Sequence, residues 1–430
     1  MITWMAILIF IISYGLIMSE KINRALVAIS GGVLLLLTNV YEWQDAFTHY
    51  IDWETIALLF SMMVLVAITK KTGVFEYVAI SFAQLVKGKP VPLLIGTAIL
   101  TAVGSAFLDN VTTVLLFVPI LLTLTSQLNL PAFPFLLTTI FSANIGGTAT
   151  LIGDPPNIMI GQAVEHFTFV SFLVNLGPIV LIIFGFTLGG LVLMFRKHLV
   201  YEKEKANELM SLNPSSYLKK TPMLYQSLTV MALTMAGFMM HPIIHVELTT
   251  VAVCAAVLLL LLTDREASSE KVFQEVEWVT LFFFIGLFML VGGLEKVGVI
   301  DEIARAMMWM SGGDLPLTAL IVLWSAGLLS GVVDNIPFVA AMIPVVQEFQ
   351  GYGMMNIDPI WWALALGACL GGNGTLLGAS ANVVVAGLAA SANHQISFMK
   401  FLLYGIPVLL FSLAAATVYI YFRYLVPFLS

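Results

Sequence analysis

The sequence has 430 residues, of which 60% are hydrophobic and only 10% are charged. Soluble domains are about 25% charged, and no globular core of this length could shield so much apolar surface from water. The composition therefore excludes a soluble enzyme, a disordered tail and a DNA-binding domain, and the net charge of −7 matters less than where the charges lie. It predicts an all-α polytopic membrane protein.

Ten membrane crossings are expected, since a helix needs about 20 apolar residues to cross a bilayer. Eight are continuous apolar stretches, near residues 3–19, 24–40, 54–70, 171–195, 225–240, 245–263, 278–295 and 401–424. Two more, near 133–163 and 359–392, are longer and are interrupted by Gly-rich polar patches. The first stretch has no basic leader and no small-residue cleavage site, so we expect a retained helix rather than a signal peptide.

Two further apolar stretches, 91–126 and 315–349, each carry an Asp-Asn pair at the centre. A straight helix of about 36 residues, rising about 1.5 Å per residue, would be too long for one crossing. Two short limbs that fold back at the polar pair fit better, which predicts two re-entrant hairpins. Non-helical backbone at membrane depth persists only inside protein or beside water. The hairpin tips are therefore candidate sites.

The basic residues predict the orientation, because cytoplasmic loops are rich in Lys and Arg. With the 20–23 turn inside, fifteen Lys and Arg side chains fall on the inner side, and three, Lys296, Arg305 and Arg423, on the outer side. Both termini then lie outside, and 196–224 is a cytoplasmic linker between two halves, 1–195 and 225–430. The expected location is a bacterial-type inner (plasma) membrane.

The sequence repeats itself at an offset of 225 residues, without a gap, from about residue 53 to 157. Matched pairs include Trp53 with Trp278, Asp109-Asn110 with Asp334-Asn335, Pro119 with Pro344, Gly146-Gly147 with Gly371-Gly372, and Asn157 with Asn382. Each half has five crossings and one hairpin, and an odd number of crossings inverts the second half. Inverted repeats with broken helices are typical of secondary transporters, whose sites lie near the midplane where the repeats meet.

Three carboxylates are the predicted coupling residues. Asp109 and Asp334 lie deep in the apolar hairpins, where an unpaired charge is costly and usually marks an ion or proton path. Since burial favours the protonated form of an acid, such a carboxylate can exchange a proton for another ligand. The alternative is that each Asp only caps the helix that follows it. Asp154 is matched by Ala379 and is predicted to be a cap or a gate residue.

The polar groups beside the tips and in the helix breaks are the predicted solute or ion ligands. Amide and hydroxyl oxygens, helix N-termini and freed carbonyls can hold Na⁺ or a neutral hydroxylated solute. The alternatives are helix–helix hydrogen bonds and packing kinks. The candidates are Asn110, Thr112, Thr113, Asn144, Gly147, Thr148, Thr150, Asn157, Asn335, Gly372, Asn373, Thr375 and Asn382. No metal site is expected, and Cys369 is interpreted as a packing residue rather than a ligand for a thiophilic solute.

These motifs resemble those of the ArsB/NhaD permeases of the ion transporter superfamily, including its P-protein branch. The matching segments are Leu108-Asp-Asn-Val-Thr-Thr113, Asn144-Ile-Gly-Gly-Thr-Ala-Thr150, Gly153-Asp-Pro-Pro-Asn157 and Asp334-Asn-Ile-Pro337. The resemblance implies a scaffold and a transport domain, of about 91–163 and 315–392, that moves as an elevator. Members of the family expel arsenite and antimonite, or exchange Na⁺ for H⁺.

We therefore expect a proton-coupled secondary transporter that exports arsenite or antimonite, with a Na⁺/H⁺ antiporter as the alternative. Arsenite near neutral pH is uncharged As(OH)₃, which amides and hydroxyls can bind. An ion channel would need a continuous pore, and an enzyme would need a nucleophile–base pair or a metal cluster, neither of which the sequence indicates. No P-loop occurs, so this chain alone is not expected to use ATP. No cofactor is expected, and a proton gradient, or Na⁺, is the expected driving force. An accessory ATPase and a homodimer are left open as partners beside the lipid bilayer, and no nucleic acid is expected.

Overall fold

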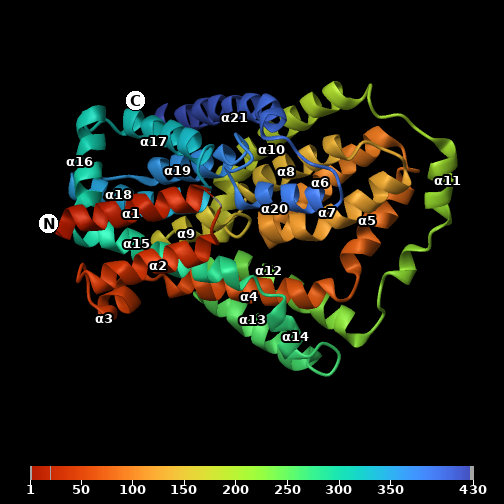
Figure 1. Cartoon of the computed structure of the whole chain (residues 1–430), viewed down its shortest axis with the longest axis horizontal. Helices are drawn as coiled ribbons and strands as arrows, with labels where there is room; N and C mark the ends of the chain where they lie inside the picture. The colour runs from red at the N-terminus through yellow and green to blue at the C-terminus, as the bar shows by residue number, and fades with distance from the viewer. Residues whose placement is uncertain (1, 20, 427–430) are drawn as a thin grey trace.

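The computed structural model describes residues 2–19 and 21–426, and its regular elements are all helices (Figure 1). The first half contains α1 (Ile2–Ser19), α2 (Arg24–Leu37), α3 (Trp43–Asp45), the π-helical turn η1 (Ala46–Tyr50), α4 (Trp53–Lys70), α5 (Val74–Leu85), α6 (Pro90–Leu108), α7 (Asn110–Gln127), α8 (Ala132–Gly147), α9 (Pro155–Ala163) and α10 (Phe169–Phe195). The connecting segment holds α11 (Lys203–Ser211) and the 3₁₀ turn η2 (Pro214–Ser216). The second half contains α12 (Pro222–Ile244), α13 (Leu248–Thr263), α14 (Ser269–Gln274), α15 (Trp278–Lys296), α16 (Val299–Ser311), α17 (Leu315–Ser330), α18 (Asn335–Gly351), α19 (Asp358–Gly371), α20 (Ser380–Ser391), α21 (Phe398–Ile420) and η3 (Tyr421–Leu425).

Eight helices are long and apolar enough to cross a membrane: α1, α4, α6, α7, α10, α12, α15, and α21 with η3. A ninth span results if α16 and α17, which meet at a bend of 120°, are counted together. The predicted multi-pass helical fold is confirmed. Two predicted crossings are short helices, since α2 has 14 residues and α13 has 16.

The chain folds back at both Asp-Asn pairs. α6 and α7 pack against each other, and a Cβ added to Gly104 in α6 would lie 3.1 Å from the Phe117 ring in α7. α17 and α18 likewise pack together across residues 331–334. The predicted fold-back gives limbs of 19 residues in α6 and 18 in α7, each long enough to cross a membrane, so re-entry of the hairpin stays a prediction. Each limb stays helical up to the polar tip, and apolar composition alone does not show where a limb ends. We call α6–α7 hairpin 1 and α17–α18 hairpin 2.

Both Gly-rich patches interrupt helices. Residues 148–154 separate α8 from α9, and residues 372–379 separate α19 from α20. After the first break, Pro155 opens α9, where the missing N–H of proline costs no hydrogen bond. The predicted discontinuities near 133–163 and 359–392 therefore exist at matching positions.

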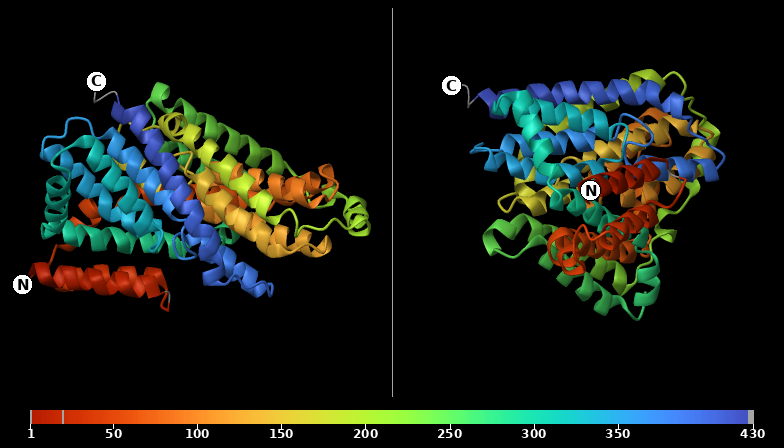
Figure 2. Two further views of the ribbon diagram at one scale, coloured as in Figure 1. Left: turned by 90° about the horizontal axis from the view of Figure 1, so that it is seen from above. Right: turned by 60° about the vertical axis from the view of Figure 1, so that its left-hand side comes forward.

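The helices form two layers (Figure 1). α4 and α12–α14 lie in one layer, and α10, α19 and α21 lie in the other. Figure 2 shows α1 along one side of the molecule, where it packs on α2 and α15. The neighbours recur in pairs: α2 packs on α15 as α13 packs on α4, α6 on α8 as α17 on α19, and α7 on α20 as α18 on α9. The inversion of the halves and the boundary of a transport domain stay predictions.

Small residues let the paired helices approach closely, as is common between membrane helices. A Cβ on Gly146 in α8 would lie 2.3 Å from the carbonyl oxygen of Ala102 in α6. The matching Gly371 in α19 faces the carbonyl oxygen of Gly327 in α17 at 2.7 Å. These contacts hold each broken helix against the first limb of its own hairpin.

The segment 196–224 packs along the end of α5 rather than standing apart. Gln84 in α5 donates hydrogen bonds to the backbone carbonyls of Leu209 at 3.0 Å and Leu212 at 2.7 Å. The backbone N–H of Lys219 donates to the Thr72 carbonyl at 2.9 Å. Its predicted cytoplasmic location stays a prediction.

Candidate functional site

An asparagine side chain spans each helix break. Asn157 donates to the Thr150 carbonyl at 2.9 Å, and Asn382 donates to the carbonyls of Gly372 at 2.7 Å and Thr375 at 2.9 Å. The amides satisfy carbonyls that the interrupted helices leave free, which membrane-embedded backbone requires. The two matched asparagines thus have the same structural role.

The amide of Asn382 also fixes the direction of a chain of hydrogen bonds. Because its nitrogen donates to carbonyls, its oxygen can only accept, and Asn144 donates to it at 2.9 Å and to the Asn373 oxygen at 3.2 Å. The oxygen of Asn144 in turn accepts from Asn110 at 3.4 Å. Asn110, Asn144, Asn373 and Asn382, which we call the amide cluster, therefore link hairpin 1 to both helix breaks.

This chain leaves polar atoms without a partner. The oxygen of Asn110 and the nitrogen of Asn373 are buried without a hydrogen bond, and so is the hydroxyl of Thr113, one turn beyond Asn110. The three residues are 3%, 0% and 0% exposed, respectively. Buried groups of this kind cost about 1–3 kcal/mol each when unpaired. An amide oxygen and an amide nitrogen of the amide cluster, and one hydroxyl in the next turn of α7, are therefore without a partner.

A second polar cluster surrounds Asp154, which contacts the tip of hairpin 2. Its side chain is fully buried, makes no helix-capping hydrogen bond, and accepts from Asn335 at 3.3 Å and 3.2 Å. The thiol of Cys369 lies 3.4 Å from the Asn157 oxygen at the same centre. Of the two predicted roles of Asp154, a capping side chain is excluded. Asn335, Asp154 and Cys369 form what we call the acidic cluster.

The two hairpin tips differ in their aspartates. Asp109 accepts from the backbone N–H of Thr112 at 2.8 Å and has a positive φ of 86°. Asp334 accepts from the backbone N–H of Ile336 at 3.1 Å and has a φ of −48°. Both therefore cap the helix that follows, as in the alternative interpretation. Asp334 also has partners beyond its own hairpin.

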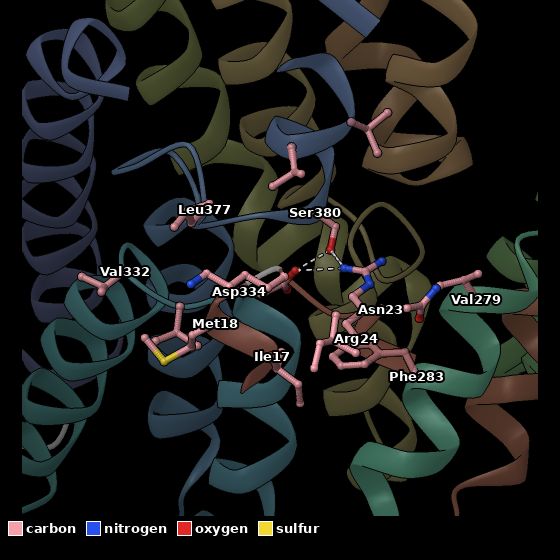
Figure 3. Close-up of a pocket in the computed structure, with 15 residues that line it drawn as sticks. Ile17, Met18, Asn23, Arg24, Val279, Phe283, Val332, Asp334, Leu377 and Ser380 are labelled. Carbon is pink, nitrogen blue, oxygen red and sulfur yellow. Dashed lines mark hydrogen bonds and ion pairs between the residues drawn. The ribbon is translucent and has the colours of Figure 1, made fainter. Parts of the chain in front are cut away.

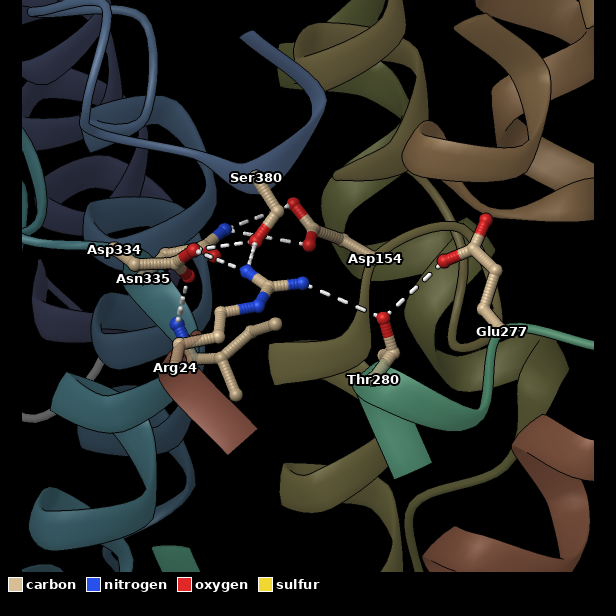
Figure 4. Close-up of polar contacts among 8 residues, drawn as sticks. Arg24, Asp154, Glu277, Thr280, Asp334, Asn335 and Ser380 are labelled. Carbon is tan, nitrogen blue, oxygen red and sulfur yellow. Dashed lines mark hydrogen bonds and ion pairs between the residues drawn. The ribbon is translucent and has the colours of Figure 1, made fainter. Parts of the chain in front are cut away.

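Arg24, from the start of α2, reaches Asp334. Its guanidinium lies 3.3 Å from the Asp334 carboxylate and donates to the Ser380 hydroxyl, which itself donates to Asp334 (Figure 3). Its other nitrogen donates to Thr280 at 3.3 Å, and Thr280 donates to Glu277 at 3.2 Å (Figure 4). This ionic cluster joins α2 and α15 to hairpin 2 and α20.

Two cavities are lined by members of the ionic cluster, and a third lies at the position that the repeat matches to the second. One of about 330 Å³ is lined by Lys21, Arg24, Asp334 and Ser380 (Figure 3). A second, of about 550 Å³, is lined by Lys70, Lys71, Thr112, Lys219 and Glu277, and we call it the basic vestibule. The third, of about 500 Å³, is lined by Asp52, Glu54, Glu295 and Gln347. α4 and α7 line the second cavity, as the matching α15 and α18 line the third.

Most of the predicted site residues gather at these centres. The remaining candidates have mainly structural contacts. Thr148 donates to the Asn144 carbonyl at 2.7 Å, Thr150 donates to the Ala106 carbonyl, and the Thr375 hydroxyl accepts from the Leu377 N–H at 3.1 Å. A Cβ on Gly147 would lie 2.4 Å from the Gly153 carbonyl, so this close approach needs glycine. No group of three His, Cys, Asp or Glu residues that could hold a metal occurs among residues 2–19 and 21–426.

Sequence reasoning missed Arg24, Thr280, Ser380 and Glu277. Arg24 was counted only as an inner-side charge, and Glu277 was expected at the membrane interface. A usable signal existed, because Arg24 begins an apolar stretch with no polar segment after it. A charged residue at such a position has to find a partner within the protein.

Residues 14–367 match the family model described as citrate transporter. The chain belongs to this family. The 46 kDa membrane protein of Mycobacterium leprae is 41% identical over 426 residues, which cover 98% of this chain and 99% of that protein. Uncharacterized transporter Rv2684 of Mycobacterium tuberculosis is 39% identical over 98% of both chains. This membership identifies a membrane transporter.

This member of the citrate transporter family also resembles more distant proteins. The P protein of Mus musculus is 33% identical over 96% of this chain, which spans 59% of its length. The Alcanivorax borkumensis YdaH transporter, whose crystal structure is described as having an unusual topology, gives a TM-score of 0.58 at 13% identity over 97% of each chain. That likeness shows the fold alone. The expected relation to P proteins is confirmed, whereas arsenite or antimonite specificity stays a prediction.

Proposed function

We propose that this protein is a proton-coupled secondary transporter that binds a small, uncharged, hydroxylated solute at the amide cluster. The observation that carries the proposal is the set of unpartnered buried atoms on Asn110, Thr113 and Asn373. A solute that both donates and accepts hydrogen bonds would satisfy all three atoms. As(OH)₃ and its antimony counterpart have this chemistry, so arsenite or antimonite export is our first candidate.

Proton coupling is assigned to the carboxylates of Asp154 and Asp334, with Asp109 as a third candidate. Asp154 and Asp334 flank Asn335 at hairpin 2, whereas the amide cluster at hairpin 1 carries no charge. Asp154 is buried, which favours the protonated form of a carboxylate, whereas Asp334 is half-buried and would give up its ion pair with Arg24 on taking up a proton. The two hairpins would thus divide the work, with solute at one and protons at the other.

The family description raises citrate as a substrate, and the charges at the site disfavour the free anion. Arg24, which contacts the tip of hairpin 2, is already paired with Asp334. Three carboxylates surround the same region, and a polycarboxylate would be repelled unless a cation accompanied it. Citrate is therefore a comparison substrate in the test rather than our candidate.

Na⁺/H⁺ antiport remains the second candidate function, favoured by one specific observation. The Asn110 oxygen and the Thr113 hydroxyl are buried oxygen atoms of the kind that hard cations bind. The unpartnered nitrogen of Asn373 opposes this reading, because a donor repels a cation. One acceptor, one hydroxyl and one donor together fit a neutral solute better than a cation.

An elevator movement is the proposed mechanism of access. Hairpins and broken helices would move together against a scaffold of α1, α2, α4, α12, α13 and α15. The ionic cluster supports this division, because it crosses the proposed boundary between α2 or α15 on one side and hairpin 2 or α20 on the other. A single contact of this kind can be broken and remade in each cycle.

The test is proton flux in liposomes that contain the purified full chain, under an imposed pH gradient. Arsenite, Na⁺ and citrate are added separately, and internal pH is followed. We expect saturable proton movement with arsenite alone. Movement with Na⁺ alone would replace our candidate by antiport, movement with citrate would refute the neutral-solute assignment, and flux that does not saturate would indicate a channel.

A further inference from the structure

We propose that Glu277 is a second partner for Arg24, and that the guanidinium moves from Asp334 to Glu277 when Asp334 takes up a proton. This inference rests on the proton coupling proposed above, and it adds a positioning residue that controls the ionic cluster from the side of the basic vestibule. Arg24 itself stays protonated throughout, and no proton passes through it.

The geometry places one hydroxyl between Arg24 and the second carboxylate. Arg24 donates to Thr280 at 3.3 Å, and Thr280 donates to the Glu277 carboxylate at 3.2 Å (Figure 4). Glu277 precedes α15 but makes no capping hydrogen bond with it. Its carboxylate is therefore not committed to the helix end and faces the guanidinium across Thr280.

Glu277 and Asp334 line different cavities. Glu277 lines the basic vestibule, whereas Asp334 lines the smaller cavity on the other side of Arg24. The other charged groups of the vestibule are Lys70, Lys71, Glu76, Lys219 and Glu275, and Lys71 is paired with Glu275 at 3.4 Å. Asp109 faces Glu277 closely enough for the two carboxylates to repel each other. On the opposite side, Lys21 lines the smaller cavity and Tyr14 faces Asp334.

The exchange follows from the charges. An ionised Asp334 attracts Arg24 directly, and a protonated Asp334 does not. The remaining anion to which the described hydrogen bonds connect Arg24 is then Glu277, through Thr280. Because the move withdraws Arg24 from both Asp334 and Ser380, it breaks the described contacts between α2 and the proposed mobile elements. Proton uptake at hairpin 2 would thereby release the movement.

The experiment is an infrared titration of the full chain in nanodiscs, without solute or gradient. The carboxyl band that Asp334→Asn removes reports protonation of Asp334. Glu277→Gln removes the competing anion, so Arg24 stays with Asp334 and the midpoint should fall by about one pH unit. Arg24→Gln should move the midpoint upward, because the carboxylate loses its cation.

Glu275→Gln is the matched control, since it removes a vestibule carboxylate that contacts Lys71 rather than Thr280. It should shift the midpoint by less than a third as much. Thr280→Val should lower the midpoint in the same direction as Glu277→Gln, and Thr280→Ser should restore it, which keeps the test valid if Glu277→Gln does not fold.

An unchanged midpoint in both Glu277→Gln and Thr280→Val overturns the proposal, as does an equal shift in Glu275→Gln. The outcome is separable from that of the proposed function. If Asp334→Asn leaves proton flux intact in liposomes while Glu277→Gln shifts the band, only the coupling role fails. If flux depends on Asp334 but the band does not shift, only the partner exchange fails.

Discussion

The two hairpin tips have the same architecture and different chemistry. At hairpin 1, Asn110 donates to Asn144, and Asp109 accepts its described hydrogen bond from the helix that it caps. At hairpin 2, the matching Asn335 donates to the carboxylate of Asp154, and Asp334 pairs with Arg24. The repeat keeps polar groups at matching positions. A few unmatched residues decide whether the asparagine at a tip meets an amide or a carboxylate, and whether the aspartate pairs with an arginine.

The unmatched residues come from both halves. Asp154, from the first half, supplies the charge beside hairpin 2, whereas Ala379 occupies the matching position in the second half. Asn144 of the first half corresponds to Cys369, which cannot donate and accept as an amide does. Single differences between matched positions thus give the two hairpin tips different partners.

The largest expected effect separates the two aspartates. Asp334→Asn should lower proton-coupled flux about 100-fold, because Arg24 loses its counter-charge and the titrating group is removed. Asp109→Asn should lower it less than about tenfold, since Asn caps a helix nearly as well as Asp. Initial rates of internal pH change in liposomes measure both. Equal losses would show that the two tips act alike.

A second comparison, between Asn144 and the matching Cys369, tests solute binding at the amide cluster. Asn144→Ala removes the partner of Asn110, Asn373 and Asn382, and the apparent solute affinity should fall about tenfold. The matched Cys369→Ala should change it less than about threefold. Concentration dependence of solute-driven flux gives both values. An equal or larger effect at Cys369 would move the solute to the acidic cluster.

Packing should differ between the halves as well. Gly146→Ala places a methyl group 2.3 Å from backbone in α6 and should lower the free energy of unfolding by about 1–3 kcal/mol. Gly371→Ala, at 2.7 Å from the nearest backbone atom, should cost less. Gly185→Ala is the control, because nothing lies within 4 Å of that position. Thermal unfolding in detergent, followed by tryptophan fluorescence, ranks the three variants.

The smallest expected effect concerns backbone strain. Asp109 has a φ of 86° and a ψ of 156°, a region that glycine tolerates and other residues occupy at a cost of about 1–3 kcal/mol. Asp109→Gly should therefore raise the free energy of unfolding by about 1 kcal/mol, since loss of the cap to Gly costs little. Asp334→Gly should lower it. A drop in stability for Asp109→Gly would mean that its side chain contributes more than the strain costs.

Much of the architecture could be predicted because it repeats. The Asp-Asn pairs, the Gly-rich breaks and the bridging Asn157 and Asn382 stand in one register, and the structure places them at matching points. The hairpin limbs have about the lengths that the predicted stretches imply, but apolar composition does not show whether a limb crosses the membrane or re-enters. The direction of the amide chain could not be predicted, because each amide can donate or accept until a carbonyl fixes one of them.

The ionic cluster was beyond prediction for a different reason. Arg24 lies outside the repeated region, and its partners Thr280, Ser380 and Asp334 are separated from it by more than half of the chain. Only the packing of α2 on α15 brings them together. Charge counting placed Arg24 on the inner side, at the start of the 24–40 crossing, because an isolated sequence position carries no information about such a distant neighbour.

The pairing of α2 with α15, and of α13 with α4, has a consequence for biosynthesis. Each half donates a helix whose main neighbour belongs to the other half. When the ribosome has completed only the first half, α2 has α1 but not α15 as a neighbour, and Arg24 has no Asp334 until residue 334 has been made. The contacts of α2 with α15 and of α4 with α13 can therefore form only after the second half has been made. The two halves complete their packing together, near the end of translation, rather than one after the other.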